Sequence, residues 1–200
     1  MWHITEHKIA FTMPPRTGST SLTKLLNEWG AKLAVPENEG GKHCFIKDAI
    51  KHMPELAEYK FYGFMRNPVD RYVSLLRYLQ QGRQVPIIAN DLGVPEKQIG
   101  STPPSTLHRL LLPKFDEFIL KRYFIAQTAW LNGAELLNFE NYDLELLKIA
   151  RLLGKTRVTI PRLNGTIHNE TISDDIKDFV RHHYADDCAL WKERFGREIA

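Results

Sequence analysis

The sequence contains little cysteine, no long apolar run and little excess charge of either sign. Its 200 residues include two cysteines, Cys44 and Cys188, which form no metal-ligand pattern and are expected to stay reduced. No stretch approaches the roughly 20 apolar residues of a membrane span, and residues 1–7 hold no signal-peptide core. The sequence therefore predicts a cytoplasmic protein without a membrane span.

The charge and composition exclude further classes of protein. A formal net charge of +3 is compatible with binding a polyanionic nucleotide but is too small to indicate nucleic-acid binding. A hydrophobic content of 43% and a charged content of 26% are ordinary for a globular protein. Because repeats, low-complexity tracts and linkers are also absent, residues 1–200 are expected to form a single domain.

The most informative feature that the sequence does contain is a turn rich in proline, glycine and hydroxyl residues. It follows an apolar run at residues 8–13 and precedes a segment, ended by Gly30, that places its apolar residues on one helix face: Leu22, Leu25, Leu26 and Trp29. This order predicts a strand, an anion-binding loop and a helix.

The chemistry of this turn suits an anion. The first N–H groups of a helix have no intrahelical partner, and the helix dipole places partial positive charge there. Arg16 adds a fixed cation and Gly18 lets the backbone approach closely. Hydroxyl donors are supplied by Thr17, Ser19, Thr20 and Ser21.

The loop differs from the ATP-binding kind. The ATP-binding pattern Gly-x-x-x-x-Gly-Lys-Ser/Thr requires a glycine where Met13 stands and a lysine where Ser19 stands. The missing lysine weakens a kinase or ATPase interpretation. An ordinary tight turn between strand and helix remains the alternative for this segment taken alone.

A second apolar run leads into a second candidate anion site. Residues 60–65 are expected to form a strand, after which Asn67 caps a helix whose first position is proline. Arg71 and Ser74 fall on the side of that helix that Asn67 occupies, so they can converge with Arg66 on an anion. Taken singly, Arg71 is more often a solvated residue and Ser74 merely a small one.

Strand and helix alternate in three places, at residues 8–29, 61–79 and 136–153. The alternation predicts an α/β fold with a P-loop-like central parallel sheet and helices on both faces. Both candidate anion motifs begin at carboxyl ends of strands, where such sheets bind ligands. Residues 82–104 are rich in proline and glycine and are expected to be an irregular surface excursion, whereas residues 173–196 are expected to form one final helix.

Together the two motifs resemble the nucleotide signatures of the sulfotransferase family that uses 3′-phosphoadenosine 5′-phosphosulfate (PAPS). The resemblance implies that residues 16–21 hold the 5′-phosphosulfate and that Arg66 and Ser74 hold the 3′-phosphate, with adenosine 3′,5′-bisphosphate (PAP) as product. Arg16, where many members have lysine, would stabilise charge on the bridging oxygen. Later segments follow the order of a branch with Golgi carbohydrate and bacterial enzymes: 124–131, 136–141, 161–164 and 184–187.

The resemblance also implies several weaker assignments. Arg162, Asn164 and Thr166 become candidates for the donor site, in the loop where the family closes over the nucleotide. Because anchored members exist, the chain could also be a trimmed catalytic domain rather than a cytoplasmic enzyme.

Transfer to a hydroxyl acceptor requires a base, and His43 is the candidate. It follows a glycine-containing loop and lies between the two motifs, where a branch of the family has its catalytic histidine. Glu37 and Glu39 are the reserve bases. A nucleophile built from Cys44 and His43 is disfavoured, because adjacent side chains usually point apart.

The sequence thus predicts a PAPS-dependent sulfotransferase with His43 as general base, with a carbohydrate preferred as acceptor only through the family branch. No metal is expected, because the protein's own cations flank a sulfuryl group that carries less charge than a phosphoryl group. The alternatives are a P-loop phosphotransferase and a catalytically silent nucleotide-binding protein. Acceptor identity and oligomeric state stay open.

Overall fold

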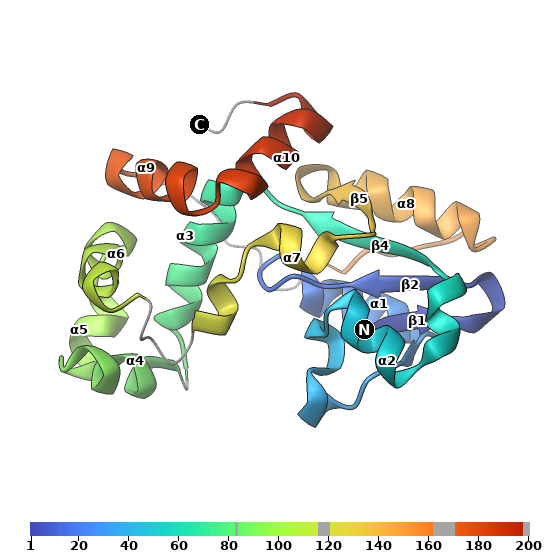
Figure 1. Ribbon diagram of the computed structural model, residues 1–200, viewed down its shortest axis with the longest axis horizontal. Helices are drawn as coiled ribbons and strands as arrows, with labels where there is room; N and C mark the ends of the chain where they lie inside the picture. The colour runs from blue at the N-terminus through green and yellow to red at the C-terminus, as the bar shows by residue number, and fades with distance from the viewer. Residues whose placement is uncertain (83, 116–120, 162–170, 198–200) are drawn as a thin grey trace.

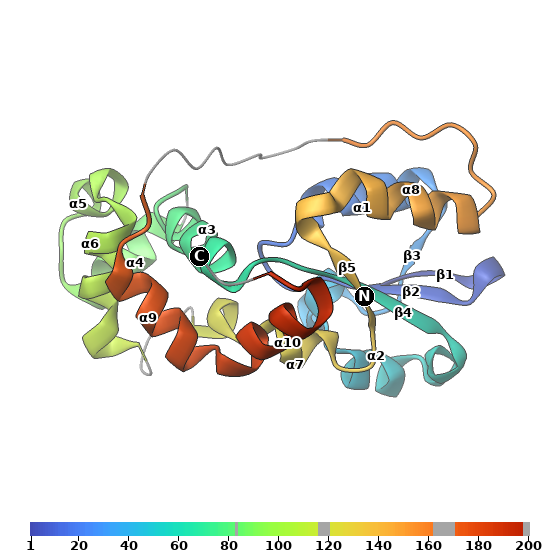
Figure 2. The ribbon, with the colours of Figure 1, turned by 90° about the horizontal axis from the view of Figure 1, so that it is seen from above.

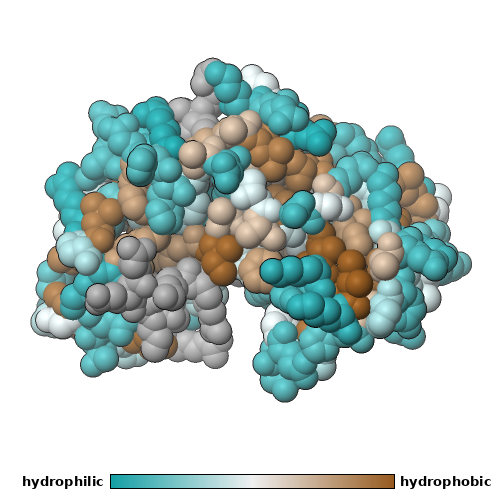
Figure 3. All heavy atoms as spheres, in the orientation of Figure 1, coloured by the Kyte–Doolittle hydropathy of each residue, from teal (hydrophilic) through white to brown (hydrophobic). Residues whose placement is uncertain are grey.

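The computed structural model describes residues 1–82, 84–115, 121–161 and 171–197. Two parts lie side by side in it: a sheet with helices on both faces, and a group of helices gathered around α3 (Figure 1). The face drawn in Figure 3 is hollowed at its lower edge, between these two parts.

The sheet has five strands in the order β3-β1-β2-β4-β5. Strands β2, β4 and β5 are parallel, which confirms the predicted α/β fold, whereas β1 runs antiparallel to both of its neighbours. The sheet is mixed because a left-handed residue, Lys8 with φ 48°, closes a short turn between β1 and β2. The strands are β1 Trp2–Ile4, β2 Ile9–Thr12, β3 Lys32–Leu33, β4 Lys60–Met65 and β5 Glu135–Asn138.

Both faces of the sheet are covered, as predicted. Figure 2 shows α1 (Ser19–Glu28) and α8 (Tyr142–Leu152) on one face, and α2 (Ile46–His52) with α7 (Gln127–Leu131) on the other. Close packing of α7 requires Gly63 in β4, where an added Cβ would lie 2.4 Å from Leu131 Cδ2. Glycine is therefore needed there for space rather than for a special backbone conformation.

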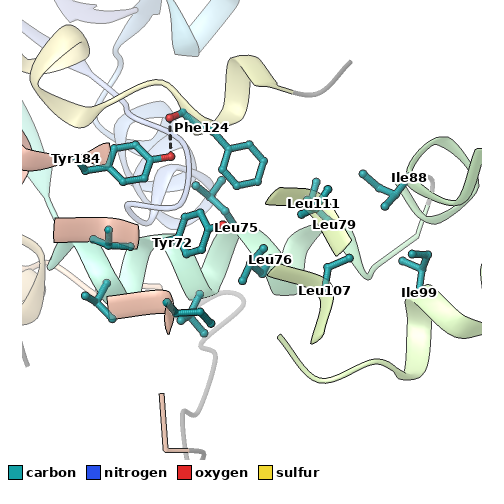
Figure 4. Close-up of a cluster of buried hydrophobic side chains, with 14 of the residues drawn as sticks. Tyr72, Leu75, Leu76, Leu79, Ile88, Ile99, Leu107, Leu111, Phe124 and Tyr184 are labelled. Atoms are coloured by element: carbon teal, nitrogen blue, oxygen red, sulfur yellow. Dashed lines mark hydrogen bonds between the residues drawn. The ribbon is translucent and has the colours of Figure 1, made fainter. Parts of the chain in front are cut away.

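The second part of the molecule is built on α3 (Pro68–Leu79). Its apolar face packs against α4 (Gln84–Leu92), α5 (Glu96–Ser101), α6 (Pro104–Leu111) and α9 (Asp174–His183), whose buried side chains meet those of α3 (Figure 4). Asn67 caps α3 as predicted: its Oδ1 accepts hydrogen bonds from the N–H groups of Val69 and Asp70, at 2.9 and 3.3 Å.

The prediction that residues 82–104 form an irregular excursion is wrong. They contain α4 and α5, because the prolines and glycines mark helix ends rather than a loop. Gly93, with φ 68°, follows α4, and Pro95 precedes α5. The apolar residues Ile88 and Ile99 are fully buried in the core around α3.

The prediction that residues 173–196 form one final helix is also wrong, since two helices occupy this segment. Tyr184 interrupts them with φ −114° and ψ 40°, between α9 and α10 (Ala185–Phe195). The Tyr184 hydroxyl donates a hydrogen bond to the carbonyl of Phe124 at 2.7 Å (Figure 4). Burial of this side chain in the core fixes the bend.

Short 3₁₀ helices complete the described chain: Thr5–His7, Glu37–Glu39, Gly41–His43, Pro54–Glu58, Leu112–Lys114, Lys121–Phe124 and Phe139–Asn141. Within the described ranges, no helix combines the length and apolar character that crossing a bilayer requires.

Candidate functional site

The loop between β2 and α1 is tightly folded by its own contacts. The Thr17 hydroxyl donates to the Pro14 carbonyl at 2.7 Å, and both Arg16 and Gly18 have left-handed backbone, with φ 70° and 76°. Left-handed backbone at an arginine costs of the order of 1 kcal/mol and persists only where the surroundings impose it. Ser19 and Thr20 then open α1, with the buried Ser21 in its first turn.

Gly18 is required at this position for two separate reasons. Its φ of 76° suits glycine, and an added Cβ would lie 2.9 Å from Phe139 Cε2 and 3.0 Å from Tyr142 Cε2. The Tyr142 hydroxyl also donates to the Gly18 carbonyl at 3.3 Å. The loop is thus pressed against the chain that follows β5.

We expect Gly18→Ala to lower the free energy of unfolding by about 2–4 kcal/mol, from backbone strain plus a steric clash. Gly30→Ala is the matched control, because Gly30 has a similar φ of 79° but nothing within 4 Å of an added Cβ. It should cost only about 1–2 kcal/mol, the strain alone. Chemical denaturation measures both, and equal losses would contradict the packing role given to Gly18.

Arg16 turns its side chain toward α3. Its Nε donates to Ser74 Oγ at 3.1 Å, and its guanidinium carbon lies 5.1 Å from the centre of the Tyr78 ring. Burial lowers the pKa of Arg16, an effect that Tyr78 opposes. No carboxylate of the described chain forms an ion pair with it. A partly buried guanidinium without a carboxylate is suited to binding an anion.

Arg66, the residue directly after β4, reaches the same loop. Its Nη1 donates to the Arg16 carbonyl at 3.3 Å, and its guanidinium carbon lies 5.0 Å from the centre of the Phe139 ring. Burial is the main cause that lowers the pKa of Arg66, and the charges of Asp70 and Glu140 oppose this. The two predicted motifs therefore adjoin, although 50 residues separate Arg66 from Arg16.

Arg71 has a structural role that the sequence interpretation did not foresee. It is 2% exposed, and its guanidinium donates to the carbonyls of Pro15, Tyr123 and Ile125, at 3.2, 3.1 and 2.9 Å. These bonds tie the loop before Arg16 to the chain that precedes α7. Arg71 was expected to converge with Arg66 on an anion. Its guanidinium instead holds these two segments together.

His43 is held against the same loop in a defined tautomer. Its Nδ1 lies 2.6 Å from the carbonyl oxygen of Met13. Because a carbonyl can only accept, Nδ1 carries the proton, and Nε2 of the neutral ring keeps its lone pair. Burial lowers the pKa of His43 from its usual value, opposed by the Met13 bond and reinforced by Lys42. Nε2 is thus a proton acceptor at neutral pH.

His43 also lines a hollow of about 430 Å³, where most polar side chains are already paired. Glu39 Oε2 lies 3.2 Å from His52 Nε2, and Lys51 Nζ lies 3.3 Å from Asp48 Oδ1. One reserve base, Glu39, is therefore in the same hollow as His43. The other, Glu37, is exposed at the start of the 3₁₀ helix Glu37–Glu39.

The sequence analysis assigned no role in the site to three further residues: Phe139 and Glu140, which follow β5, and Tyr78 of α3. Phe139 packs on both Gly18 and Arg66, Glu140 Oε1 accepts from Asn67 N at 3.0 Å, and Tyr78 faces Arg16. The sequence could have indicated Phe139 and Glu140, because they follow a third strand that ends at the same edge of the sheet. The candidates Arg162, Asn164 and Thr166 lie outside the described residues.

Comparison with known proteins gives one match. No family model matches the chain, and no curated protein matches it. Among solved structures, the crystal structure of a sulfotransferase from Alicyclobacillus acidocaldarius is similar, with 16% sequence identity and a TM-score of 0.34. The alignment covers 75% of this chain and 60% of that chain, so this chain spans less than two thirds of that protein's length.

Proposed function

We propose that this protein is a PAPS-dependent sulfotransferase. The observation that carries the proposal is the meeting of two separately encoded motifs: Arg66 Nη1 lies 3.3 Å from the Arg16 carbonyl, and Arg16 Nε lies 3.1 Å from Ser74 Oγ. A donor with phosphate groups on both the 3′ and the 5′ positions of one ribose needs cations grouped in this way.

The residues present suit such a donor. The N-terminus of α1, with the hydroxyl groups of Ser19, Thr20 and Ser21 around it, would hold the 5′-phosphosulfate. The Thr17 hydroxyl donates to the Pro14 carbonyl, so Thr17 would contribute through its place in the loop rather than as a donor. Arg66 and Ser74 would hold the 3′-phosphate. Arg16 lies between the two groups because its side chain reaches Ser74 while its backbone belongs to the loop. We assign Arg16 to stabilising negative charge on the departing phosphate.

The donor supplies a sulfuryl group already bonded to a good leaving group. His43 Nε2 removes the proton of the acceptor hydroxyl as that oxygen forms its bond to sulfur and the bond from sulfur to the 5′-phosphate oxygen breaks. The proton remains on the imidazole, and the electron pair of the broken bond leaves with PAP. Met13, through its carbonyl, keeps the ring in the orientation that leaves Nε2 free.

The acceptor would approach through the hollow that His43 lines. The side chains that line this hollow include both donors and acceptors of hydrogen bonds. Phe45 also lines it, and its ring stacks on that of Trp130 with ring centres 4.1 Å apart. We propose a hydroxyl acceptor, with a carbohydrate preferred through the resemblance of the sequence to carbohydrate sulfotransferases.

The proposal is tested by incubating the protein with [³⁵S]PAPS and a panel of glycans, lipids, phenols and peptides in the presence of EDTA. We expect a labelled product and tight binding of PAP without metal. A separate assay with ATP and magnesium, without EDTA, tests the alternative: ATP consumption that requires magnesium would favour the phosphotransferase. Binding of PAP with no transfer to any acceptor would favour a silent nucleotide-binding protein.

A further inference from the structure

Two segments that the proposed chemistry does not use meet behind Arg66. Gln127 opens α7, and Asp187 lies in the first turn of α10. Gln127 is fully buried and forms two hydrogen bonds to the main chain of Arg66: its Oε1 accepts from the N–H and its Nε2 donates to the C=O, both at 2.9 Å. One side chain thus satisfies both backbone polar groups of the proposed 3′-phosphate residue.

This pairing takes over where the sheet ends. Strand β4 ends at Met65, whose partner in β5 is Asn138, while the pairing with β2 already stops at Gly63. Arg66 therefore has no strand residue beside it in the described ladders. The Gln127 amide presents a donor and an acceptor to Arg66 as a neighbouring strand would. The backbone hydrogen bonding of the sheet thus continues for one residue beyond β4, to Arg66.

Asp187 holds Gln127 in turn. It is 1% exposed, and its two carboxylate oxygens accept hydrogen bonds from the N–H groups of Gln127 and Thr128, both at 2.8 Å. A buried carboxylate is costly unless it is fully hydrogen-bonded. Here it fixes the start of α7, and hence the position of Gln127, from a helix near the end of the chain.

We propose that Asp187 and Gln127 are positioning residues, which fix the main chain of Arg66 and so aim its guanidinium at the 3′-phosphate of the donor. This inference rests on the proposed function. The pair acts only through Arg66, so its loss should weaken recognition of the 3′-phosphate selectively and leave the 5′ end of the site intact.

The test compares PAP with adenosine 5′-monophosphate, which lacks the 3′-phosphate, by isothermal titration calorimetry on the full chain. We expect Gln127→Leu to lower the ratio of the two affinities about tenfold, which corresponds to about 1.4 kcal/mol. The affinity for the monophosphate should stay within about twofold. Asp187→Asn, which removes one acceptor, should lower the ratio less and in the same direction.

Gln80→Leu is the control: the Gln80 amide is half-buried and, like that of Gln127, donates to the backbone, here to the carbonyls of Ile99 and Thr102. It should lower stability without changing the affinity ratio. The positioning role is overturned if Gln127→Leu leaves the ratio unchanged or weakens both nucleotides equally. If that variant does not fold, Asp187→Asn decides by the same criterion.

A double variant makes the assignment specific to Arg66. In an Arg66→Met background, adding Gln127→Leu should change the PAP affinity by less than about twofold. A further tenfold loss would show that Gln127 acts elsewhere and would overturn the inference. Wild-type protein that binds PAP and the monophosphate equally would overturn the proposed function itself, which is a separate outcome measured before any variant.

Discussion

His43→Ala is expected to lower kcat for sulfuryl transfer by about a thousandfold, the typical contribution of a positioned general base. The reason is geometric, since Nδ1 is held by the Met13 carbonyl and Nε2 is the only ring nitrogen that can take a proton. The affinity for PAP should change by less than about twofold, because His43 is assigned to the acceptor side. Single-turnover transfer from [³⁵S]PAPS and calorimetry with PAP measure the two quantities separately.

The pH profile gives an independent check on the same residue. Burial lowers the pKa of His43, so the ring stays neutral at pH 7 and gains its proton only below the usual range near 6.5. The rate should therefore be flat around neutrality and fall as the pH decreases through that lowered pKa. His43→Ala should remove this acid limb from the remaining rate.

His52→Ala is the control, because His52 lines the same hollow but pairs with Glu39. It should retain most of the activity. If His43→Ala turns over at the wild-type rate, the base is a glutamate, and Glu39→Gln or Glu37→Gln then becomes the variant that abolishes transfer. A wild-type rate in all three variants would remove the general base from the proposal.

The sequence was informative wherever a short pattern determines structure by itself. The helix α1 after the glycine-containing turn and the cap of α3 at Asn67 depend on local chemistry, and both form as predicted. The parallel arrangement of β2, β4 and β5 followed from their alternation with helices, and it explains why the ends of β2 and β4 bring Arg16 and Arg66 together.

The sequence was less informative where tertiary packing decides. The fate of Arg71 depends on carbonyls from residues far along the chain, which helical spacing cannot reveal. The bend at Tyr184 is fixed by burial of its side chain in the core, where the hydroxyl bonds to the Phe124 carbonyl, and such packing cannot be read from residues 173–196 alone. Strands β1 and β3 have three and two residues, too short for any periodic signal.

Arg66→Met is expected to weaken PAP binding about a hundredfold, since a bidentate contact from a guanidinium to a phosphate is worth about 3 kcal/mol. The affinity for adenosine 5′-monophosphate should fall far less, because the 3′-phosphate is the group assigned to Arg66. Arg109→Met is the control: it removes the same charge from an exposed ion pair with Asp175 in the helical part of the molecule. It should leave both affinities unchanged.

Comparing the two nucleotides separates two roles of Arg66: binding of the 3′-phosphate and support of the loop. Its Nη1 also donates to the Arg16 carbonyl, so the guanidinium supports the loop that would hold the 5′ end. If support of the loop were its main role, Arg66→Met would weaken PAP and the monophosphate by the same factor. A loss confined to PAP means that the guanidinium contacts the second phosphate, and Arg66→Lys should then recover only part of the affinity, because a lysine keeps the charge but cannot form the planar fork.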